Sequence, residues 1–439
     1  MITSKTIKTT IVLLLAVLMM IGTAACDSAS PASTTGNQKV TVTLMTWEGD
    51  STNALIDAAM KKFMAQNPDI IVQRIPSPNS DYGTKLTSLV VAKKLPDLFW
   101  AGNDTEQQYG AQGLLYDYTN LAGSATGGFD LSKFAPASID NWKNNGHLFG
   151  LPSLMNTYGV WYNADLFQAA GLPLPKAGWT YQEMLHDAQV LTQKNGNTVS
   201  RYGLVAPPDD PFAISNYSVS AGGAPFEDKI LNPTSVTASP QFIEGTKLFA
   251  NAVQNGSVTP PGYATDNVQA SFAAGKIPML YFGQWLAAGF LQSKPSFKYG
   301  FAPLPVVKDS VQPYDAVGIA SPSYIQHPDA VWKVMQYLDT TAWESILPGS
   351  PVAPAAYVPS STPYFDTLKS DGLTTVADSV QYELTAQNKL GIRFVAPWST
   401  KANDIITANW DGILLGKTPT DSGVQTMVQQ LNDVIKQNS

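Results

Sequence analysis

The stretch "VTVTLMTWEGDSTNALIDAAMKKFMAQNPDIIVQ", residues 40–73, decides the fold. Its first residues alternate apolar side chains with threonines, a pattern that predicts a strand. Apolar residues then recur at helical spacing until Asn67 and Pro68, which end that helix. A second strand, 70–75, follows directly. Strand, helix and strand joined by such short connections predict a parallel sheet covered by helices.

The same pattern continues with a helix at about 81–94 and a strand at 95–101, so the predicted fold class is α/β. In such sheets, ligands bind just beyond the carboxyl ends of the strands. Large aromatic, acidic and amide side chains stand at these positions after the first and third strands: Trp47, Glu48, Asp50, Trp100, Asn103 and Asp104. We therefore expect a binding site at this edge of the sheet.

Two of these strand ends pair a tryptophan with an acid, which suits a ligand with flat apolar faces and a rim of hydroxyl groups. A sugar is such a ligand. The alternative is structural, with Trp100 packing on the sheet core and Asp104 capping the helix that begins directly after it. Each residue alone fits either interpretation. The occurrence of two tryptophan–acid pairs at neighbouring strand ends favours a carbohydrate site.

Residues 1–25 have the pattern of a secretion signal peptide. Lys5 and Lys8 precede the apolar run "IVLLLAVLMMI", and the segment ends in small residues. The run is too short to span a bilayer. Since cleavage removes both lysines and no acidic residue, the 27 basic and 34 acidic residues of the chain become 25 and 34. This negative balance argues against nucleic acid or anionic lipid as the partner, because both require clustered lysine and arginine.

Cys26, the only cysteine among 439 residues, stands between the signal peptide and residues 26–38, whose small and polar side chains predict a flexible tether. The junction resembles the bacterial lipobox, in which the cysteine is lipidated and becomes the new amino terminus. Thr23 departs from that motif, which usually has leucine there. The alternative is ordinary secretion with a free Cys26. We expect an extracytoplasmic protein, periplasmic or on the cell surface, that is held at the membrane by this lipid alone.

The mature chain of roughly 400 residues is longer than one hydrophobic core usually serves, so two lobes are expected. Several segments carry a resemblance to a known family: "FMAQNPDIIVQ", "LPDLFWAGNDTEQQYGAQGLLYDYTNL", "AGGAPFEDKILNPTSVTASPQFIEGTKLFANAV", "FAAGKIPMLYFGQWLAA" and "GILLGKTPTDSGVQTMVQQLNDVI". In this order and spacing they resemble the family 1 extracellular solute-binding proteins of bacterial ABC importers, a group that includes maltose-binding protein. The resemblance covers residues 40–438.

The resemblance implies a type II periplasmic-binding-protein fold, in which two α/β lobes close by a hinge around a ligand cleft. One lobe would contain residues 39–153 and 314–346, and the other residues 154–313 and 347–439. The chain would cross between the lobes near 151–163, 312–315 and 347–356. The implied function is capture of a carbohydrate by a monomer that uses no cofactor or metal, followed by delivery to the permease subunits of an ABC transporter.

The resemblance also implies ligand contacts at the strand ends, in the crossing segment and in the second lobe. Matched motif by motif, these contacts are Asp50, Trp100, Asp104, Asn156, Asp210, Phe212, Trp285 and Trp398. Asn156 and Phe212 replace an acid and a tyrosine of the maltose binders, and Thr105 replaces a basic residue. Because a lost charged hydrogen-bonding group changes affinity by kcal/mol rather than tenths, maltose itself is not the expected ligand.

Trp285 is the contact that the residues themselves support best. The apolar strand "IPMLYFGQW" turns polar only at Gln284, so we expect the Trp285 ring to stack on a pyranose face while Gln284 offers a donor and an acceptor. The alternative is a tryptophan packed between helix and sheet. Arg393 is either a clamp for a carboxylate or phosphate ligand or a salt-bridged structural residue. Packing is the expected role of five other tryptophans: Trp142, Trp161, Trp332, Trp343 and Trp410.

A glycoside hydrolase is the main alternative, because it needs two carboxylates facing each other across the scissile bond. Asp50, Asp104 and Asp210 are the candidates for that role. Other enzyme classes lack their motifs: the three histidines have no zinc-binding spacing, and "GKT" at 416–418 lacks the upstream glycine of a phosphate-binding loop. A surface adhesin would more naturally be built from all-β modules or repeats, and the sequence has neither. We therefore expect a binding protein rather than an enzyme.

Overall fold

The computed structural model describes residues 39–77, 79–124, 130–205, 211–230, 232–263, 267–385, 388–391, 396 and 398–438. The chain forms two units, Met1–Gln38 and Lys39–Ser439. The expected signal peptide, the tether with Cys26, and the candidate residues Asp210 and Arg393 lie outside the described residues.

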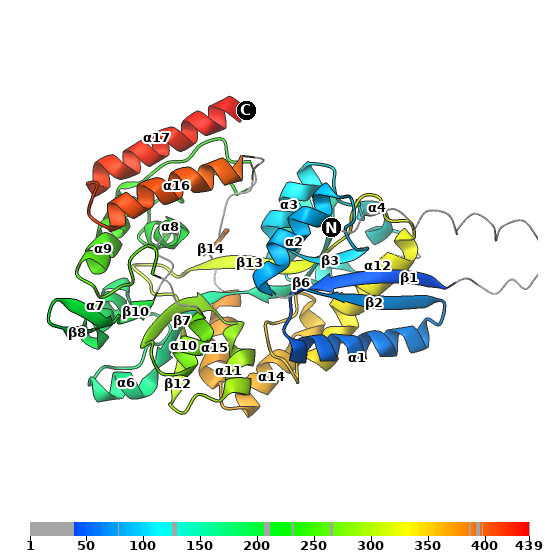
Figure 1. Ribbon diagram of the computed structural model, residues 1–439, viewed down its shortest axis with the longest axis horizontal. Coiled ribbons are helices and arrows are strands. Elements are labelled where there is room, and N and C mark those ends of the chain that lie inside the picture. Colours follow the sequence, from blue (N-terminus) through cyan, green and yellow to red (C-terminus); the bar gives the residue numbers. More distant parts are fainter. Residues whose placement is uncertain are drawn as a thin grey trace, which may run out of the picture. The chain divides into compact units, whose positions relative to one another are not determined.

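The first sheet contains the three strands predicted for the start of the chain (Figure 1). Its strands are β1 (Val40–Thr46), β2 (Ile70–Pro76), β3 (Leu98–Gly102), β6 (Gly150–Asn156), β13 (Val311–Ala320) and β14 (Asn388–Gly391). The order is β14-β13-β3-β1-β2, with β6 also paired to β13. β1 is parallel to β2 and β3, as predicted. β13 adds an antiparallel strand that the sequence pattern does not predict.

α1 (Asp50–Gln66) joins β1 to β2, and its apolar face explains why it forms. Four apolar residues at helical spacing are buried: Ile56, Ala59, Met60 and Phe63. The helix ends at Asn67, whose backbone N–H and side-chain amide both donate to the Phe63 carbonyl. α2 (Asn79–Val91) then leads to β3, which completes the predicted alternation of strands and helices.

The second sheet has the strand order β10-β11-β7-β12. Its strands are β7 (Tyr158–Asn163), β10 (Leu204–Val205), β11 (Met279–Gly283) and β12 (Tyr299–Pro303). β7 is antiparallel to both β11 and β12. Thr157 alone separates β6 from β7, so the chain passes from the first sheet to the second at this residue.

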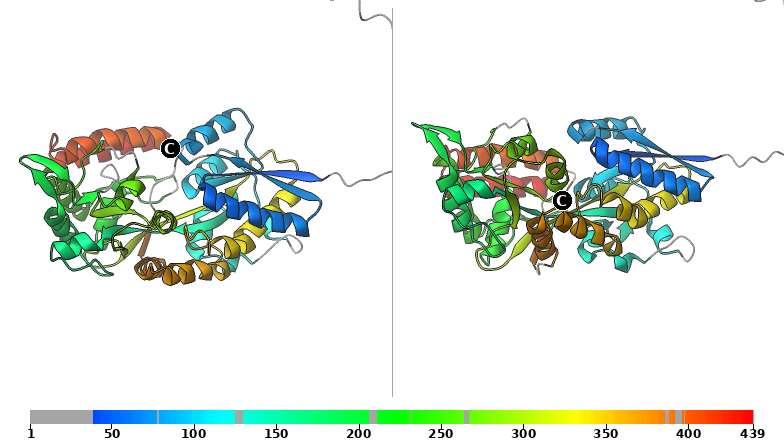
Figure 2. Two further views of the ribbon diagram at one scale, coloured as in Figure 1. Left: turned by 60° about the horizontal axis from the view of Figure 1, so that its bottom comes forward. Right: turned by 90° about the horizontal axis from the view of Figure 1, so that it is seen from below.

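Both faces of the second sheet are covered, since alternate residues of β7 belong to different cores. Val160 and Tyr162 pack in one core, and Trp161 packs in the other. α16 (Ser399–Leu414) and α17 (Thr420–Asn438) lie side by side and contact α9 (Pro240–Gln254) on the first of these faces (Figures 1 and 2). On the other face, α15 (Thr374–Leu384) packs on β12, where the Ser379 hydroxyl donates to the Phe301 carbonyl at 2.9 Å.

The remaining described elements are shorter or lie around these two sheets. The helices are α3 (Asn103–Ala111), α4 (Thr119–Ala122), α5 (Pro136–Asn141), α6 (Ala164–Ala169), α7 (Tyr181–Leu191), α8 (Pro211–Ser220), α10 (Val268–Ala273), α11 (Leu286–Ser293), α12 (Pro328–Tyr337), α13 (Trp343–Ile346) and α14 (Thr362–Ser370). Short turns of other helix types are η1 (Leu131–Lys133), η2 (Leu338–Ala342) and η3 (Val358–Ser360). Two short hairpins pair β4 (Lys143–Asn144) with β5 (His147–Leu148) and β8 (Gln193–Asn195) with β9 (Thr198–Arg201).

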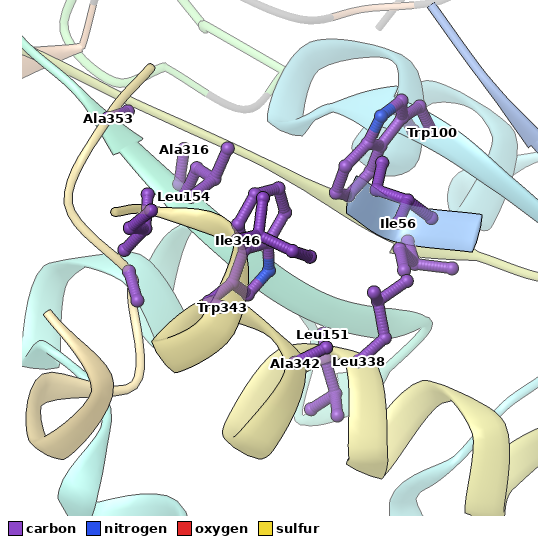
Figure 3. Packing of buried hydrophobic residues seen from close by; sticks show 14 of the residues in the cluster. Ile56, Trp100, Leu151, Leu154, Ala316, Leu338, Ala342, Trp343, Ile346 and Ala353 are labelled. Carbon is purple, nitrogen blue, oxygen red and sulfur yellow. The ribbon is translucent and has the colours of Figure 1, made fainter. Parts of the chain in front are cut away.

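Two stacked tryptophans lie in the core of the first sheet. The rings of Trp100 and Trp343 have centroids 6.0 Å apart and planes 17° from parallel. Figure 3 shows Trp343 near Leu154 and Ile346, so this core joins α13 to β6 and β3. The five tryptophans expected to pack are buried, which confirms that prediction: Trp142, Trp161, Trp332, Trp343 and Trp410.

Candidate functional site

Trp47 follows β1 and presents a half-buried ring at the carboxyl edge of the first sheet. The ring packs edge-on against Tyr82, with centroids 5.1 Å apart, and lies 6.0 Å from the Trp100 ring. The Tyr82 hydroxyl in turn donates to the Trp100 carbonyl at 2.8 Å. These contacts fix the Trp47 ring and leave part of it exposed, which suits stacking against a ligand.

Trp100 itself has no exposed surface. Its ring lies 6.0 Å from both Trp47 and Trp343. The alternative in which Trp100 packs in the sheet core therefore describes this structure, and the expected direct contact of its ring with a ligand is corrected. The reason is that Trp343, from a helix far along the chain, covers the ring. The neighbouring Trp47 ring, by contrast, is partly accessible.

Glu48 comes directly after Trp47, and its surroundings change its acidity. Burial raises the pKa of Glu48 from 4.5 to about 7. Its backbone carbonyl accepts a hydrogen bond from the Asn53 side chain at 2.6 Å, so the turn that carries Glu48 is anchored to α1. A carboxyl group with this pKa changes from donor to acceptor near neutral pH, and a sugar hydroxyl pairs with either form.

Asp50 and Asp104 are both exposed and lie in the first turns of α1 and α3. α3 begins at Asn103, and Gly102 holds the capping position without a side-chain bond, so Asp104 does not cap this helix. Its carboxylate accepts from the Thr105 backbone N–H at 2.8 Å. Acidic residues in the first turn of a helix are favoured by the helix dipole, so these positions also have a structural explanation.

Trp285 follows β11, at the residue before α11, and its ring is half-buried. The ring meets Tyr158 edge-on at 5.3 Å and Phe282 at 5.5 Å. Gly283 makes this arrangement possible, because a Cβ atom there would lie 1.8 Å from the Trp285 ring. Tyr158 and Phe282 are also half-buried and were not among the expected site residues. Their only signal in the sequence is that both are aromatic and lie at the ends of apolar strands.

Gln284 is completely buried, and both ends of its amide are already hydrogen-bonded. Its Oε1 accepts from the Thr157 backbone N–H at 2.7 Å, and its Nε2 donates to the Met155 carbonyl at 3.2 Å. The expectation that Gln284 offers its donor and acceptor to a ligand is therefore wrong. The physical reason is that β7 and β11 pair, which brings the end of β11 against the residues between β6 and β7.

Asn156 lies at the end of β6, between the two residues that Gln284 binds. It pairs with Asp315 of β13 in the register of the first sheet. The Asn156 side-chain amide donates to the Asp315 carboxylate at 3.3 Å. This pair places an amide and a carboxylate where the chain crosses between the sheets, and Asp315 was not among the expected site residues.

One further contact brings elements of the two sheets together. The Gln292 amide of α11 donates to the Ser51 hydroxyl of α1 at 2.7 Å. Ser51 follows Asp50, and α11 begins directly after Trp285. The first turn of α1 therefore lies beside the helix that follows the Trp285 ring.

The remaining candidate residues are Trp398, Phe212, Asp210 and Arg393. Trp398 is 9% exposed and packs in the core of the second sheet, at the residue before α16. Phe212 lies in α8, whose first side chains are outside the described set. Asp210 and Arg393 are outside the described residues altogether.

Over residues 39–438, apart from the gaps given above, no group of three or more His, Cys, Asp or Glu side chains is placed to hold a metal ion. Within the same ranges, no helix combines the length and apolar character needed to cross a membrane.

Two helix-covered sheets joined by crossing strands, with half-buried rings at the strand ends, define the class of two-lobed binding proteins. The chain belongs to the family of bacterial extracellular solute-binding proteins, which it matches over residues 48–344. It is similar to the maltotriose-binding protein of Pyrococcus abyssi, with 26% identity over 70% of this chain and 63% of that protein. It is also similar to a maltodextrin-binding protein of Bacillus subtilis, with 24% identity over 74% of this chain and 75% of that protein.

Solved structures show the same fold. The ABC substrate-binding protein Lmo0181 from Listeria monocytogenes, in complex with cycloalternan, has a TM-score of 0.77 at 22% identity, over 91% of this chain and 99% of that one. The GacH receptor of Streptomyces glaucescens, solved unliganded and with acarbose, has a TM-score of 0.71 at 18% identity, over 91% and 99%. The expected α/β fold with two lobes is confirmed.

Proposed function

We propose that the protein binds a carbohydrate outside the cytoplasm and delivers it to the permease of an ABC transporter. One observation carries the proposal: the half-buried Trp285 ring stands edge-on to Tyr158. Tyr158 follows Asn156 by two residues, and the Asn156 amide donates to the Asp315 carboxylate. An aromatic platform next to an amide and a carboxylate matches the two kinds of surface that a sugar presents, an apolar face and a rim of hydroxyls.

Trp47 and Glu48 supply the same combination at the edge of the first sheet. Trp47 has an accessible ring, and the Glu48 carboxyl exchanges its proton near neutral pH. We place the ligand between these two residues and the Trp285 ring. The bond from Gln292 to Ser51 supports this placement, because it brings α11 and the first turn of α1 together. Asp50, Asp104, Asp210, Phe212 and Trp398 stay in the proposed site as predicted contacts.

The relatives favour a carbohydrate over other solutes. Two similar proteins are a maltotriose-binding protein and a maltodextrin-binding protein, and two similar proteins have been solved with cycloalternan and with acarbose. Sequence identities between 18% and 26% do not identify which sugar this chain binds. The class of ligand is therefore the proposal, and the identity of the sugar is left to experiment.

We propose a lobe of residues 39–153 and 314–346 and a second lobe of residues 154–313 and 347–439. The strands of the second sheet all lie within 154–313, which supports this division. Closure about the crossing segments would then bury the ligand. The protein works as a monomer without cofactor and makes or breaks no bond in its ligand. Residues 1–25 are removed on export, and a lipid on Cys26 is the only attachment to the membrane.

A thermal-shift screen tests the proposed function. Protein lacking residues 1–38 is heated with sugars, oligosaccharides, polyols and sugar phosphates, and each ligand that raises the melting temperature is recovered and analysed. A ligand at a hundred times its Kd adds about 2.7 kcal/mol to the free energy of unfolding, which gives a clear shift. A carbohydrate recovered intact supports the proposal. A cleaved product would favour the glycoside hydrolase, and stabilisation by no carbohydrate in the panel would contradict the proposed ligand class.

A further inference from the structure

Gln284 joins the two elements of the proposed site through its hydrogen bonds. Its side chain spans the backbone on both sides of Asn156, since Oε1 accepts from the Thr157 N–H at 2.7 Å and Nε2 donates to the Met155 carbonyl at 3.2 Å. Its own backbone N–H donates to the Thr157 carbonyl at 3.3 Å. Three hydrogen bonds thus hold this residue to the peptide groups that flank Asn156.

The Trp285 ring is fixed by the same three-residue segment. Trp285 follows Gln284 directly, and the ring folds back over Gly283, where no Cβ atom would fit. The Gly283 carbonyl accepts from the Trp161 indole N–H at 3.0 Å, which ties the segment to the buried core. A change in the backbone at Gln284 therefore changes the direction in which the Trp285 ring points.

Burial makes the amide of Gln284 hard to replace. Gln284 is 0% exposed and Thr157 is 2% exposed, so water cannot substitute for a lost partner. Removing one partner of a buried hydrogen bond costs the desolvation of the other, about 1–3 kcal/mol. An apolar side chain of the same length would leave the Thr157 N–H and the Met155 carbonyl unpaired, and the segment would move to satisfy them.

We propose that Gln284 is a positioning residue of the ligand site, which holds the Trp285 ring and the Asn156 amide in a fixed mutual arrangement without touching the ligand. This inference deepens the proposed function and rests on it for the role of the two contacts. The hydrogen bonds of Gln284 are made within the protein, so the main test needs no ligand.

The test is fluorine NMR of the protein labelled with 5-fluorotryptophan, in which the 10 tryptophans serve as reporters. Loss of a signal in Trp285→Phe assigns Trp285. In Gln284→Met, the Trp285 signal is expected to shift or broaden, while those of the buried Trp332 and Trp410 stay in place. Gln326→Met is the matched control, because Gln326 is exposed and its amide donates to the Tyr324 carbonyl in a surface turn.

A conservative variant separates positioning from loss of stability. Gln284→Glu has the same shape, and burial keeps a carboxyl there protonated, so one oxygen still accepts from Thr157 while the O–H donates to Met155. We expect Gln284→Glu to restore the wild-type Trp285 signal. If Gln284→Met does not fold, Gln284→Asn, which is one methylene shorter and cannot reach both partners, replaces it.

Three results would overturn the inference: an unchanged Trp285 signal in Gln284→Met or Gln284→Asn, an equal change at Trp332 and Trp410, or no restoration by Gln284→Glu.

A second experiment measures the binding of maltotriose. Gln284→Met is expected to weaken binding about tenfold or more in the wild-type background and by a smaller factor in Trp285→Ala, where only the contribution through Asn156 remains. An equal loss in both backgrounds counts against the inference. If the wild type does not bind maltotriose, this arm gives no binding data, the proposed ligand class is tested by the thermal-shift screen instead, and the NMR result decides the inference.

Discussion

Glu48 gives a pH dependence of stability whose sign follows from the structure. Burial raises the pKa of this carboxyl from 4.5 to about 7, so the folded protein binds the Glu48 proton more tightly than the unfolded chain does. The contribution of Glu48 to stability is therefore fully present below pH 4.5. It is lost progressively as the pH rises to about 7, and the loss is constant above that value.

The size of the effect follows from the same two values. A rise from 4.5 to about 7 corresponds to about 3 kcal/mol of unfolding free energy. Because the side chain is only half-buried, contact with water reduces this to on the order of 1–3 kcal/mol. Glu48→Gln keeps the shape of the neutral acid and removes its titration. The variant should match the wild type at pH 4.5 and be more stable by on the order of 1–3 kcal/mol at pH 8.

The assay is urea unfolding of both proteins between pH 4.5 and 8, followed by tryptophan fluorescence. Other buried acids, Glu106, Asp339 and Glu383, also titrate on unfolding, because burial raises the pKa of each well above its usual range. Their contributions cancel in the difference between wild type and variant. Glu344→Gln, at an exposed position of α13, is the control. A wild-type-minus-variant difference that stays constant from pH 4.5 to 8 would refute the reasoning about Glu48.

Three further predictions concern the ligand, the anchor and the stability of one helix. Trp285→Ala should cost about 2 kcal/mol or more of binding, roughly a thirtyfold rise in Kd by calorimetry, because it removes an aromatic ring that the ligand would bury on binding, whereas Trp285→Phe should retain most of the affinity. Equal affinity in all three proteins would remove Trp285 from the site. Cys26→Ser should move the full-length protein from the membrane to the soluble fraction, as seen by fractionation and immunoblotting, and continued membrane retention would disprove the lipid anchor. Thr180 and Glu183 form a reciprocal capping box at the start of α7. Thr180→Ala should therefore lower the unfolding free energy by about 1 kcal/mol, and Thr180→Ser should not. No measurable loss of stability in urea titrations of Thr180→Ala would contradict this assignment.

Local periodicity was enough to predict the strands and helices over 40–101, because each element there is specified by its own residues. β13 could not be predicted in the same way. It pairs with β3 and β6, which lie far earlier in the chain, and its place in the sheet depends on those strands rather than on its own pattern. The resemblance to a known family supplied the two-lobed fold that local patterns alone did not.

In the candidate site, the roles predicted from the sequence for Gln284 and Trp100 differ from those in the structure. Gln284 follows an apolar strand and has the chemistry of a ligand contact. Its Oε1 nevertheless accepts a hydrogen bond from the backbone N–H of Thr157, 127 positions away. Trp100 stands at a strand end and is covered by Trp343, which comes from a distant helix. Trp47 and Trp285 keep accessible rings, so their contact with a ligand stays a prediction. Burial by distant segments decides these cases, and the sequence carries no local sign of it.

The central claim is that a carbohydrate lies against the Trp285 ring, near Asn156 and Glu48. The most direct test is a crystal structure of the protein with the sugar that gives the largest thermal shift. We predict a sugar ring stacked on Trp285, with its hydroxyls bonded to polar side chains at the ends of β1 and β6. A sugar seated elsewhere, for example in the shallow groove between α16 and α17 that Lys401, Asn409 and Gln437 line, would contradict this account.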